Sequence, residues 1–369
     1  MNRTVKFTEH TRIAVLILVL VLIFSMLPGC SSVPTYDPLD GVETVTITDD
    51  YERAVRIPAD ISRIAASGST AQMILMTVAP EMLVGLTSSP STLQMPYFPE
   101  EMWYLPTFGQ FYGSKSSLNM EALIDAQPQL IIDLGDRKIS GKSDMDVIQK
   151  QTGIPVVFFE ATLETLPATY RTLGKLLGCE EQAEKLAAYV EKTTDMAAKN
   201  SAKIPENSKY SVMFGTGSTG LACNAQGSSQ ADVIEIIGAK NAIIPEEITD
   251  RGGGTIVSLE EVYTVQPDVI LLSRGGPYND LKDNEWSGLN AVKNDMYYEI
   301  PDLPYSWMAS PPSVNRVLGV WWLGNLLYPE YYDYDMTAVA IEFYDLFWHY
   351  DLSDEEAAEM LANSTGKKN

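Results

Sequence analysis

Apolar and polar positions alternate along this chain with two periods, and these predict strands and helices in turn. Residues 44–48 alternate threonine with β-branched apolar residues, which is typical of a half-buried strand. Short apolar runs predict further strands at 61–66, 82–86, 130–133, 155–159, 210–214 and 269–272, and a helical pattern covers 71–78. Strands that alternate with helices favour an α/β fold with a largely parallel sheet.

The middle of the chain interrupts this alternation. Residues 163–200 carry no strand pattern, and their leucines and alanines recur at helical spacing. Gly178 breaks the pattern, and a second helical stretch begins after it. We expect a helix over about 180–200 with a length of about 30 Å, at 1.5 Å per residue. The strand–helix alternation resumes after residue 203.

Two segments repeat each other at a constant offset of 139 residues. Residues 119–132 (NMEALIDAQPQLII) align with residues 258–271 (SLEEVYTVQPDVIL), so that Glu121 matches Glu260 and Pro128 matches Pro267. Each segment predicts a capped helix, a proline that follows it and a buried strand. The halves therefore look like copies of one α/β unit, although chance similarity of two ordinary helix–strand units is the alternative.

The first 30 residues have the features of an export signal. Three basic residues precede an uncharged apolar run over 13–26, which is followed by Leu27-Pro28-Gly29-Cys30. A basic start, a short apolar core and a small residue before a cleavage point are typical of a secretory signal. A cysteine directly after that residue indicates lipidation at Cys30, although Pro28 departs from the usual motif. The 14-residue run is shorter than the roughly 20 residues that span a bilayer, which disfavours an uncleaved anchor.

Charge and rare residues exclude several functions. The net charge is −23, and removing residues 1–29, with three basic residues and one acidic residue, makes it −25. Such acidity argues against nucleic acid as a partner. The only histidines are His10 and His349, which disfavours most zinc sites and triads with a histidine base. Cys179 and Cys223 are either buried thiols or one disulfide pair.

The order of these features resembles the substrate-binding proteins of ABC importers for iron–siderophore complexes, haem and cobalamin. The most specific segments are 119–132, 286–301 (WSGLNAVKNDMYYEIP) and 310–330 (SPPSVNRVLGVWWLGNLLYPE). The resemblance covers roughly residues 44–361. It implies an α/β fold of two Rossmann-like lobes joined by a single long α-helix, with a ligand cleft between the lobes.

The expected organisation and partners follow from this resemblance. The predicted parts are a lipoprotein signal peptide (1–29), a tether (30–43), an N-terminal α/β lobe (44–162), a helical connection (163–203) and a C-terminal α/β lobe (204–369). The expected protein is a monomer without catalytic activity or a cofactor, lipid-anchored on the extracytoplasmic face of the cell membrane. It would bind an iron–siderophore or related metal chelate and pass it to an ABC permease and ATPase. Cobalamin, haem, and a sensory or adhesion role are the alternatives.

Ligands in open α/β sheets bind beyond the carboxyl ends of the strands. The candidate ligand-binding residues are Ser69, Thr70, Thr87, Tyr112 and Asp136 from the first lobe and Arg274, Trp307 and Arg316 from the second. The Arg274 guanidinium suits a carboxylate or catecholate oxygen, or else pairs with a neighbouring acid. Tyr112 and Trp307 would offer flat apolar walls to a planar ligand, or else pack their own loops. Arg316 lies at the start of a predicted helix, where a structural role is favoured over ligand binding.

Two further expectations concern metal and docking. No histidine lies near a predicted strand end, so a metal held by its own organic chelator fits better than one held by the protein, and haem ligation by tyrosine or methionine stays open. In the family, one acidic residue on each lobe docks onto the permease. Glu121 and Glu260 hold matched places in the repeat and are the candidates, with simple helix N-terminal acids as the alternative.

Overall fold

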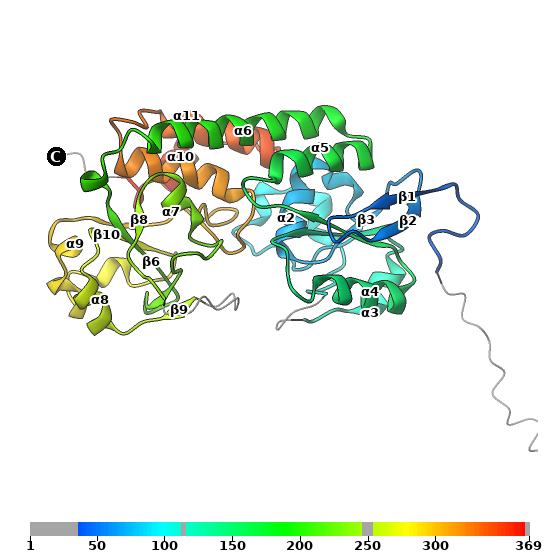
Figure 1. Cartoon of the computed structure of the whole chain (residues 1–369), viewed down its shortest axis with the longest axis horizontal. Helices are drawn as coiled ribbons and strands as arrows, with labels where there is room; N and C mark the ends of the chain where they lie inside the picture. Colours follow the sequence, from blue (N-terminus) through cyan, green and yellow to red (C-terminus); the bar gives the residue numbers. More distant parts are fainter. Residues whose placement is uncertain (1–35, 112–115, 246–253, 366–369) are drawn as a thin grey trace, which may run out of the picture. The chain divides into compact units, whose positions relative to one another are not determined.

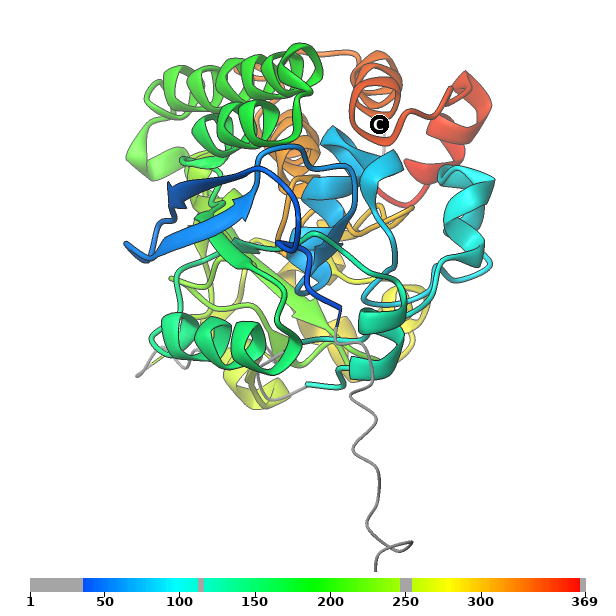
Figure 2. The same ribbon diagram turned by 90° about the vertical axis from the view of Figure 1, so that its right-hand side faces the viewer.

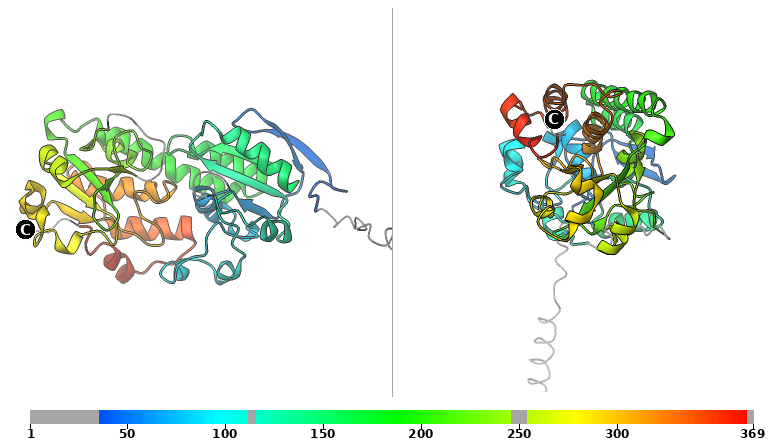
Figure 3. Two further views of the ribbon diagram at one scale, coloured as in Figure 1. Left: turned by 90° about the horizontal axis from the view of Figure 1, so that it is seen from below. Right: turned by 90° about the vertical axis from the view of Figure 1, so that its left-hand side faces the viewer.

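The computed structural model describes residues 36–111, 116–245 and 254–365. The chain divides into two units, Met1–Asp37 and Pro38–Asn369, and the account below concerns the second. Cys30 and Tyr112 lie outside the described residues. Within the second unit the chain forms two α/β lobes, which Figure 1 and Figure 3 show side by side.

The first lobe is built on a parallel sheet in the order β3-β4-β5. Its strands are β3 (Ile64–Ala66), β4 (Leu130–Gly135) and β5 (Val156–Glu160), and they are almost wholly buried. Helices α2 (Ser69–Val78), α3 (Met120–Asp125) and α4 (Gly141–Thr152) alternate with them, and β1 (Thr44–Thr48) and β2 (Ala54–Pro58) form an antiparallel hairpin. Figure 2 shows the blue hairpin beside this sheet. The strand expected at 82–86 is reduced to isolated bridges between Ile64 and Leu83 and between Leu86 and Thr107.

The second lobe holds a six-stranded sheet in the order β11-β10-β6-β7-β9, with β8 paired to β6. The strands are β6 (Ser211–Thr216), β7 (Ala222–Cys223), β8 (Lys240–Asn241), β9 (Thr255–Ile256), β10 (Val269–Leu272) and β11 (Tyr297–Glu299). Its helices are α7 (Asp232–Ile236), α8 (Leu259–Val265), α9 (Asn290–Lys293), α10 (Asn315–Leu327), α11 (Met336–Phe343) and α12 (Asp354–Met360), with a π-helical turn, η7 (Tyr344–Trp348), after α11. β10 runs parallel to both β6 and β11, as the α/β pattern predicts.

Two helices connect the lobes. Helix α5 (Leu166–Leu177) ends at Gly178, whose φ of 71° is in the left-handed region, and α6 (Glu180–Ser201) follows at once. The 22 residues of α6 span about 33 Å at 1.5 Å per residue. Helix α6 packs on α5 at one end and on α10 and α7 at the other, for example where Trp321 Nε1 donates to Thr193 Oγ1 at 2.8 Å. It lies across both lobes along the top of Figure 1.

The C-terminal segment adds contacts between the lobes that the sequence did not predict. The side-chain amide of Gln182, on α6, donates to the carbonyl oxygens of Thr77 in α2 and Leu346 in η7 at 3.3 and 3.1 Å. The rings of Tyr97 and Tyr350 lie 4.8 Å apart between their centroids. One apolar core therefore runs from the first lobe through α6 into the second, because the aromatic C-terminal residues bury their surface on both.

The structure reproduces the internal repeat in detail. Gln127 and Gln266 follow α3 and α8 with φ of 49° and 47°, a left-handed conformation that is uncommon outside glycine. The side chains of Asn119 and Ser258 cap the two helices by accepting from the backbone N–H three residues on. The two halves thus share the same helix–turn–strand geometry at matched positions, as the alignment predicts.

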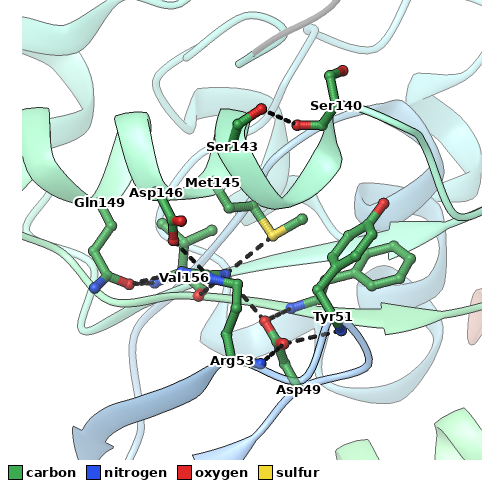
Figure 4. A network of polar contacts seen from close by, with 10 residues as sticks. Asp49, Tyr51, Arg53, Ser140, Ser143, Met145, Asp146, Gln149 and Val156 are labelled. Atoms are coloured by element: carbon green, nitrogen blue, oxygen red, sulfur yellow. Dashed lines mark hydrogen bonds and ion pairs between the residues drawn. The ribbon is translucent and has the colours of Figure 1, made fainter.

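A buried arginine fastens the β1–β2 hairpin to the first lobe (Figure 4). The Arg53 guanidinium lies 3.0 Å from Asp49 Oδ2 and 2.9 Å from Asp146 Oδ1, and it also donates to the Val156 carbonyl oxygen at 2.9 Å. The side chain of Asp49 is 0% exposed and that of Arg53 is 6% exposed. A buried charge pair is tolerated only with such full hydrogen bonding, so these contacts fix the hairpin against α4 and β5.

Candidate functional site

The candidate site is a cleft of about 830 Å³ between the two lobes. The first lobe contributes the loop that follows β4, residues 136–140. The second lobe contributes the segments around β7, α7 and β9: Cys223, Asn224, Ala225, Gln226, Gly227, Ser228, Ser229, Gln230, Asp232, Glu235, Pro245, Gly254 and Thr255. The volume lies within the usual range for small-molecule sites, roughly 300–1,000 Å³.

Most residues in the described lining of this cleft have polar or charged side chains, and apolar ones such as Ile139 and Pro245 lie between them. Hydroxyl and amide side chains, such as Ser140, Ser228 and Gln226, stand beside charged groups of both signs. No aromatic side chain occurs in the described lining. Such walls suit a solute whose outer atoms form hydrogen bonds, whereas a planar macrocycle needs flat apolar walls.

Tyr51, in the β1–β2 turn, supports the first-lobe wall. Its hydroxyl donates to the Lys138 carbonyl oxygen at 2.9 Å and accepts from the Lys138 N–H at 2.7 Å. Burial raises the pKa of Tyr51, so the hydroxyl stays protonated at neutral pH. A methyl group on Gly141 would lie 2.1 Å from this hydroxyl, which explains a glycine at the start of α4. The hairpin therefore holds the loop 136–140 in place through one side chain.

An ion pair supports the second-lobe wall. Arg316, 2% exposed at the start of α10, donates through Nη1 to Asp232 Oδ2 and to the Ser229 carbonyl oxygen at 2.9 Å. Burial raises the pKa of Asp232 to about 6, although Arg316 acts in the opposite direction; Asp136 and Glu235 also raise it. Arg316 thus positions a cleft-lining carboxylate from behind, which is the structural role that the sequence favoured for it.

Other predicted ligand residues lie in different surroundings. Asp136 is exposed and lines the cleft. Ser69 is partly buried and accepts a hydrogen bond from Gln110 Nε2, and the Thr70 carbonyl oxygen accepts from Ser313 Oγ at 3.3 Å. Thr87 is 4% exposed and bonds through both its N–H and its hydroxyl to Gln72 Oε1. Ser69, Thr70 and Thr87 are absent from the described lining of the cleft.

The structure corrects the expectation for Trp307, and Arg274 lies outside the described lining of the cleft. Trp307 is 2% exposed and donates through Nε1 to the Tyr344 hydroxyl at 3.3 Å, so it packs in the core and forms no wall of the cleft. The reason is close packing of α10, because a methyl group on Gly319 would lie 2.1 Å from the Trp307 carbonyl oxygen. Arg274 is exposed; burial raises the pKa values of Asp302 and Tyr97, and the charge of Arg274 acts in the opposite direction on both. It too is absent from the described lining.

The sequence missed the loops that form most of the described lining. Residues 138–140 and 224–230 were not singled out, although Gln226-Gly227-Ser228-Ser229-Gln230 is a polar run directly after an apolar segment. A run of small polar residues past a strand end was the available signal.

Glu121 and Glu260 are both exposed near the starts of α3 and α8. Figure 1 shows these helices on the side of each lobe that lies away from α6. The side chain of Ser258 forms a capping box with Glu261, so the cap of α8 does not involve Glu260.

Three further properties concern thiols, metals and membranes. Cys179 and Cys223 are free, and burial raises the pKa of the two thiols to about 11 and about 12. Within the described ranges, no group of three or more His, Cys, Asp or Glu side chains is placed so that it could hold a metal ion. No helix in the described part of the chain is both long and apolar enough to cross a bilayer.

Known proteins with similar sequences and structures point to one family. The family model for periplasmic binding proteins matches residues 64–303. The high-affinity heme uptake system protein IsdE of Staphylococcus aureus (strain Newman) is 23% identical over 208 residues, which cover 54% of this chain and 68% of that protein.

Solved structures agree with this assignment. An ABC transporter solute binding protein from Sulfurospirillum deleyianum is 25% identical with a TM-score of 0.79, covering 86% of this chain and 99% of that one. The molybdate-bound protein MolA of Haemophilus influenzae shares the fold at 20% identity and a TM-score of 0.68, covering 84% and 99%. The matched family model spans both lobes and the helices between them, and the chain belongs to the periplasmic binding protein family.

Proposed function

We propose that this protein captures a hydrophilic metal chelate, of the iron–siderophore class, in the cleft between its lobes and delivers it to an ABC permease and its ATPase. The observation that carries the proposal is a cleft of about 830 Å³ lined by hydroxyl, amide and charged groups from both lobes. Since no cluster of metal-binding side chains occurs among the described residues, a metal in the cleft would bring its ligands with it. The role is binding without catalysis.

Haem is the second candidate, because the Staphylococcus aureus relative is named a heme uptake protein. Cobalamin shares the wide planar macrocycle of haem, with amide side chains around its rim. Such ligands bury wide faces against aromatic or aliphatic side chains. The described lining contains no aromatic side chain, and most of its side chains are polar or charged, which favours a more hydrophilic chelate.

Titration of intrinsic tryptophan fluorescence tests the solute class. The purified protein is titrated with a ferric hydroxamate, a ferric catecholate, ferric citrate, haemin and cobalamin. We expect saturable binding of at least one hydrophilic ferric chelate, with haemin and cobalamin at least tenfold weaker. A protein that binds haemin or cobalamin best, or none of the five, would contradict the proposed solute class.

Delivery requires the protein to stay near the membrane and to find its permease. We propose acylation of Cys30 as the anchor on the extracytoplasmic face, the chain acting as a monomer. Replacing Cys30→Ser should move the protein from the detergent phase to the aqueous phase on phase partitioning. Unchanged partitioning would contradict the lipid anchor and leave the solute proposal standing.

A further inference from the structure

Asn224 carries an unpaired buried amide on the wall of the cleft. It directly follows β7, is 2% exposed and lines the cleft. Its backbone is fixed, because its N–H donates to the Phe214 carbonyl oxygen and its own carbonyl oxygen accepts from Asn241 Nδ2, both at 2.9 Å. The side-chain Nδ2 has no hydrogen-bond partner within the protein.

Asp232 presents an unpaired acceptor on the same wall. Arg316 holds its Oδ2, whereas its Oδ1 is buried and has no hydrogen-bond partner. Since Arg316 also bonds the carbonyl oxygens of Ser229 and Ser313, the orientation of the carboxylate is set by contacts behind the wall. Oδ1 is therefore the oxygen left for a further partner.

Buried polar atoms in native proteins are nearly always paired, and each exception calls for an explanation. Three unpaired buried side-chain atoms occur among the described residues: Tyr189 Oη, Asn224 Nδ2 and Asp232 Oδ1. Tyr189 packs in the aromatic core beside Phe347 and Phe343. The other two residues, one with a free donor and one with a free acceptor, line the same cleft.

We propose that Asn224 and Asp232 are the specificity-determining pair for the solute. Asn224 Nδ2 donates to an oxygen of the solute, and Asp232 Oδ1 accepts from one of its hydroxyl or N–H groups. This inference rests on the proposed function and narrows it to chelates that display hydroxyl or amide groups on their outer surface. A site built for hydrogen bonds strongly rejects ligands that lack them, because its buried polar groups then stay unpaired.

The pair also disfavours a small, fully deprotonated oxyanion. Such an anion has no proton to donate to Asp232 Oδ1, and the three carboxylates in the lining, those of Asp136, Asp232 and Glu235, outnumber the two cations of Arg137 and Lys138. A hydroxamate chelate with outer amide groups satisfies both atoms. The inferred solute thus differs from the molybdate bound to the structural relative MolA.

The test compares two isosteric variants of the full chain in mild detergent, Asn224→Leu and Asp232→Asn. The probes are ferrioxamine B, which carries outer amide groups, and sodium molybdate, both followed by tryptophan fluorescence. Asn279→Leu and Asp283→Asn are the matched controls, because both residues are exposed and outside the cleft lining. We expect at least tenfold weaker ferrioxamine B binding in each cleft variant and no change in either control.

A stability measurement separates a binding role from a structural one. Asn224 Nδ2 has no partner to lose, so Asn224→Leu should melt no lower than the parent protein. If that variant does not fold, Asn224→Asp, which replaces the donor with an acceptor, should show the same loss of binding.

The outcomes are distinct. If both variants bind ferrioxamine B within twofold of the parent, or if the parent prefers molybdate, Asn224 and Asp232 do not determine specificity. Solute capture by the protein would still stand. A parent protein that binds no ferric chelate in the wider titration overturns the proposed function, and the inference falls with it.

Discussion

The hydroxyl group of Tyr51 makes two hydrogen bonds to the backbone of one residue in the cleft loop, Lys138, and its removal tests whether the β1–β2 hairpin supports the site. The bonds join Tyr51 Oη to the carbonyl oxygen and the N–H of Lys138 at 2.9 and 2.7 Å. Tyr51→Phe removes both bonds. The ring stays, and with it the contact with Phe158, at 4.4 Å between centroids, and the guanidinium of Arg137 5.4 Å above the ring.

The size of the effect follows from these contacts. A typical intramolecular hydrogen bond contributes about 1 kcal/mol, so two bonds give an upper limit of about 2 kcal/mol. Lys138 is exposed, and water can therefore replace part of the loss. We expect the loop to lose about 1 kcal/mol of stabilisation, which corresponds to about fivefold weaker binding of a solute that needs the ordered loop.

Hydrogen exchange read by mass spectrometry on peptides that cover residues 136–141 measures the local effect, and solute titration measures the binding. Tyr104→Phe is the matched control, because Tyr104 is 77% exposed and its hydroxyl makes a single contact of 3.4 Å with Glu100. We expect faster exchange and weaker binding in Tyr51→Phe alone. Unchanged exchange in residues 136–141 would refute the supporting role.

Three other perturbations follow from the same structure. Arg53→Met leaves the buried Asp49 carboxylate with backbone donors but without its cation, and should lower the free energy of unfolding by about 3–5 kcal/mol in urea titrations; a loss below about 1 kcal/mol would contradict the buried network. Glu121→Lys with Glu260→Lys should leave solute affinity unchanged and abolish uptake by cells; lost binding would assign both residues a structural role. Burial raises the pKa of Asp232 to about 6, so the folded protein favours the protonated carboxyl. The stability that this preference contributes is complete below about pH 4 and is lost as the pH rises through 6. The parent should therefore lose stability relative to Asp232→Asn over that interval, and a gain would mean that pairing with Arg316 outweighs burial.

Features fixed by local chemistry were predictable from the sequence. The repeat at an offset of 139 anticipates the capped helices α3 and α8 and the strands after them, because caps, prolines and buried β-branched runs act over a few residues. The break at Gly178 and the long helix after it follow from helical periodicity in the same way.

Features that depend on distant packing were not predictable. Trp307 stands on a loop in the sequence, but the close approach of α10 places it in the core. The cleft walls depend on side chains far away in the chain, such as Tyr51 on Lys138 and Arg316 on Asp232, 87 and 84 residues apart. No local pattern marks such pairs, and the polar run at residues 226–230 was the one local signal for the second wall.

The central claim is that the solute binds between the lobes. A crystal structure of the protein with its tightest-binding ferric chelate, with iron located by anomalous diffraction, tests it directly. We expect one strong iron peak between the loop 136–140 and the segment 223–230, with no protein side chain bound to the iron. An iron peak outside this cleft, or iron held directly by protein side chains, would contradict the account.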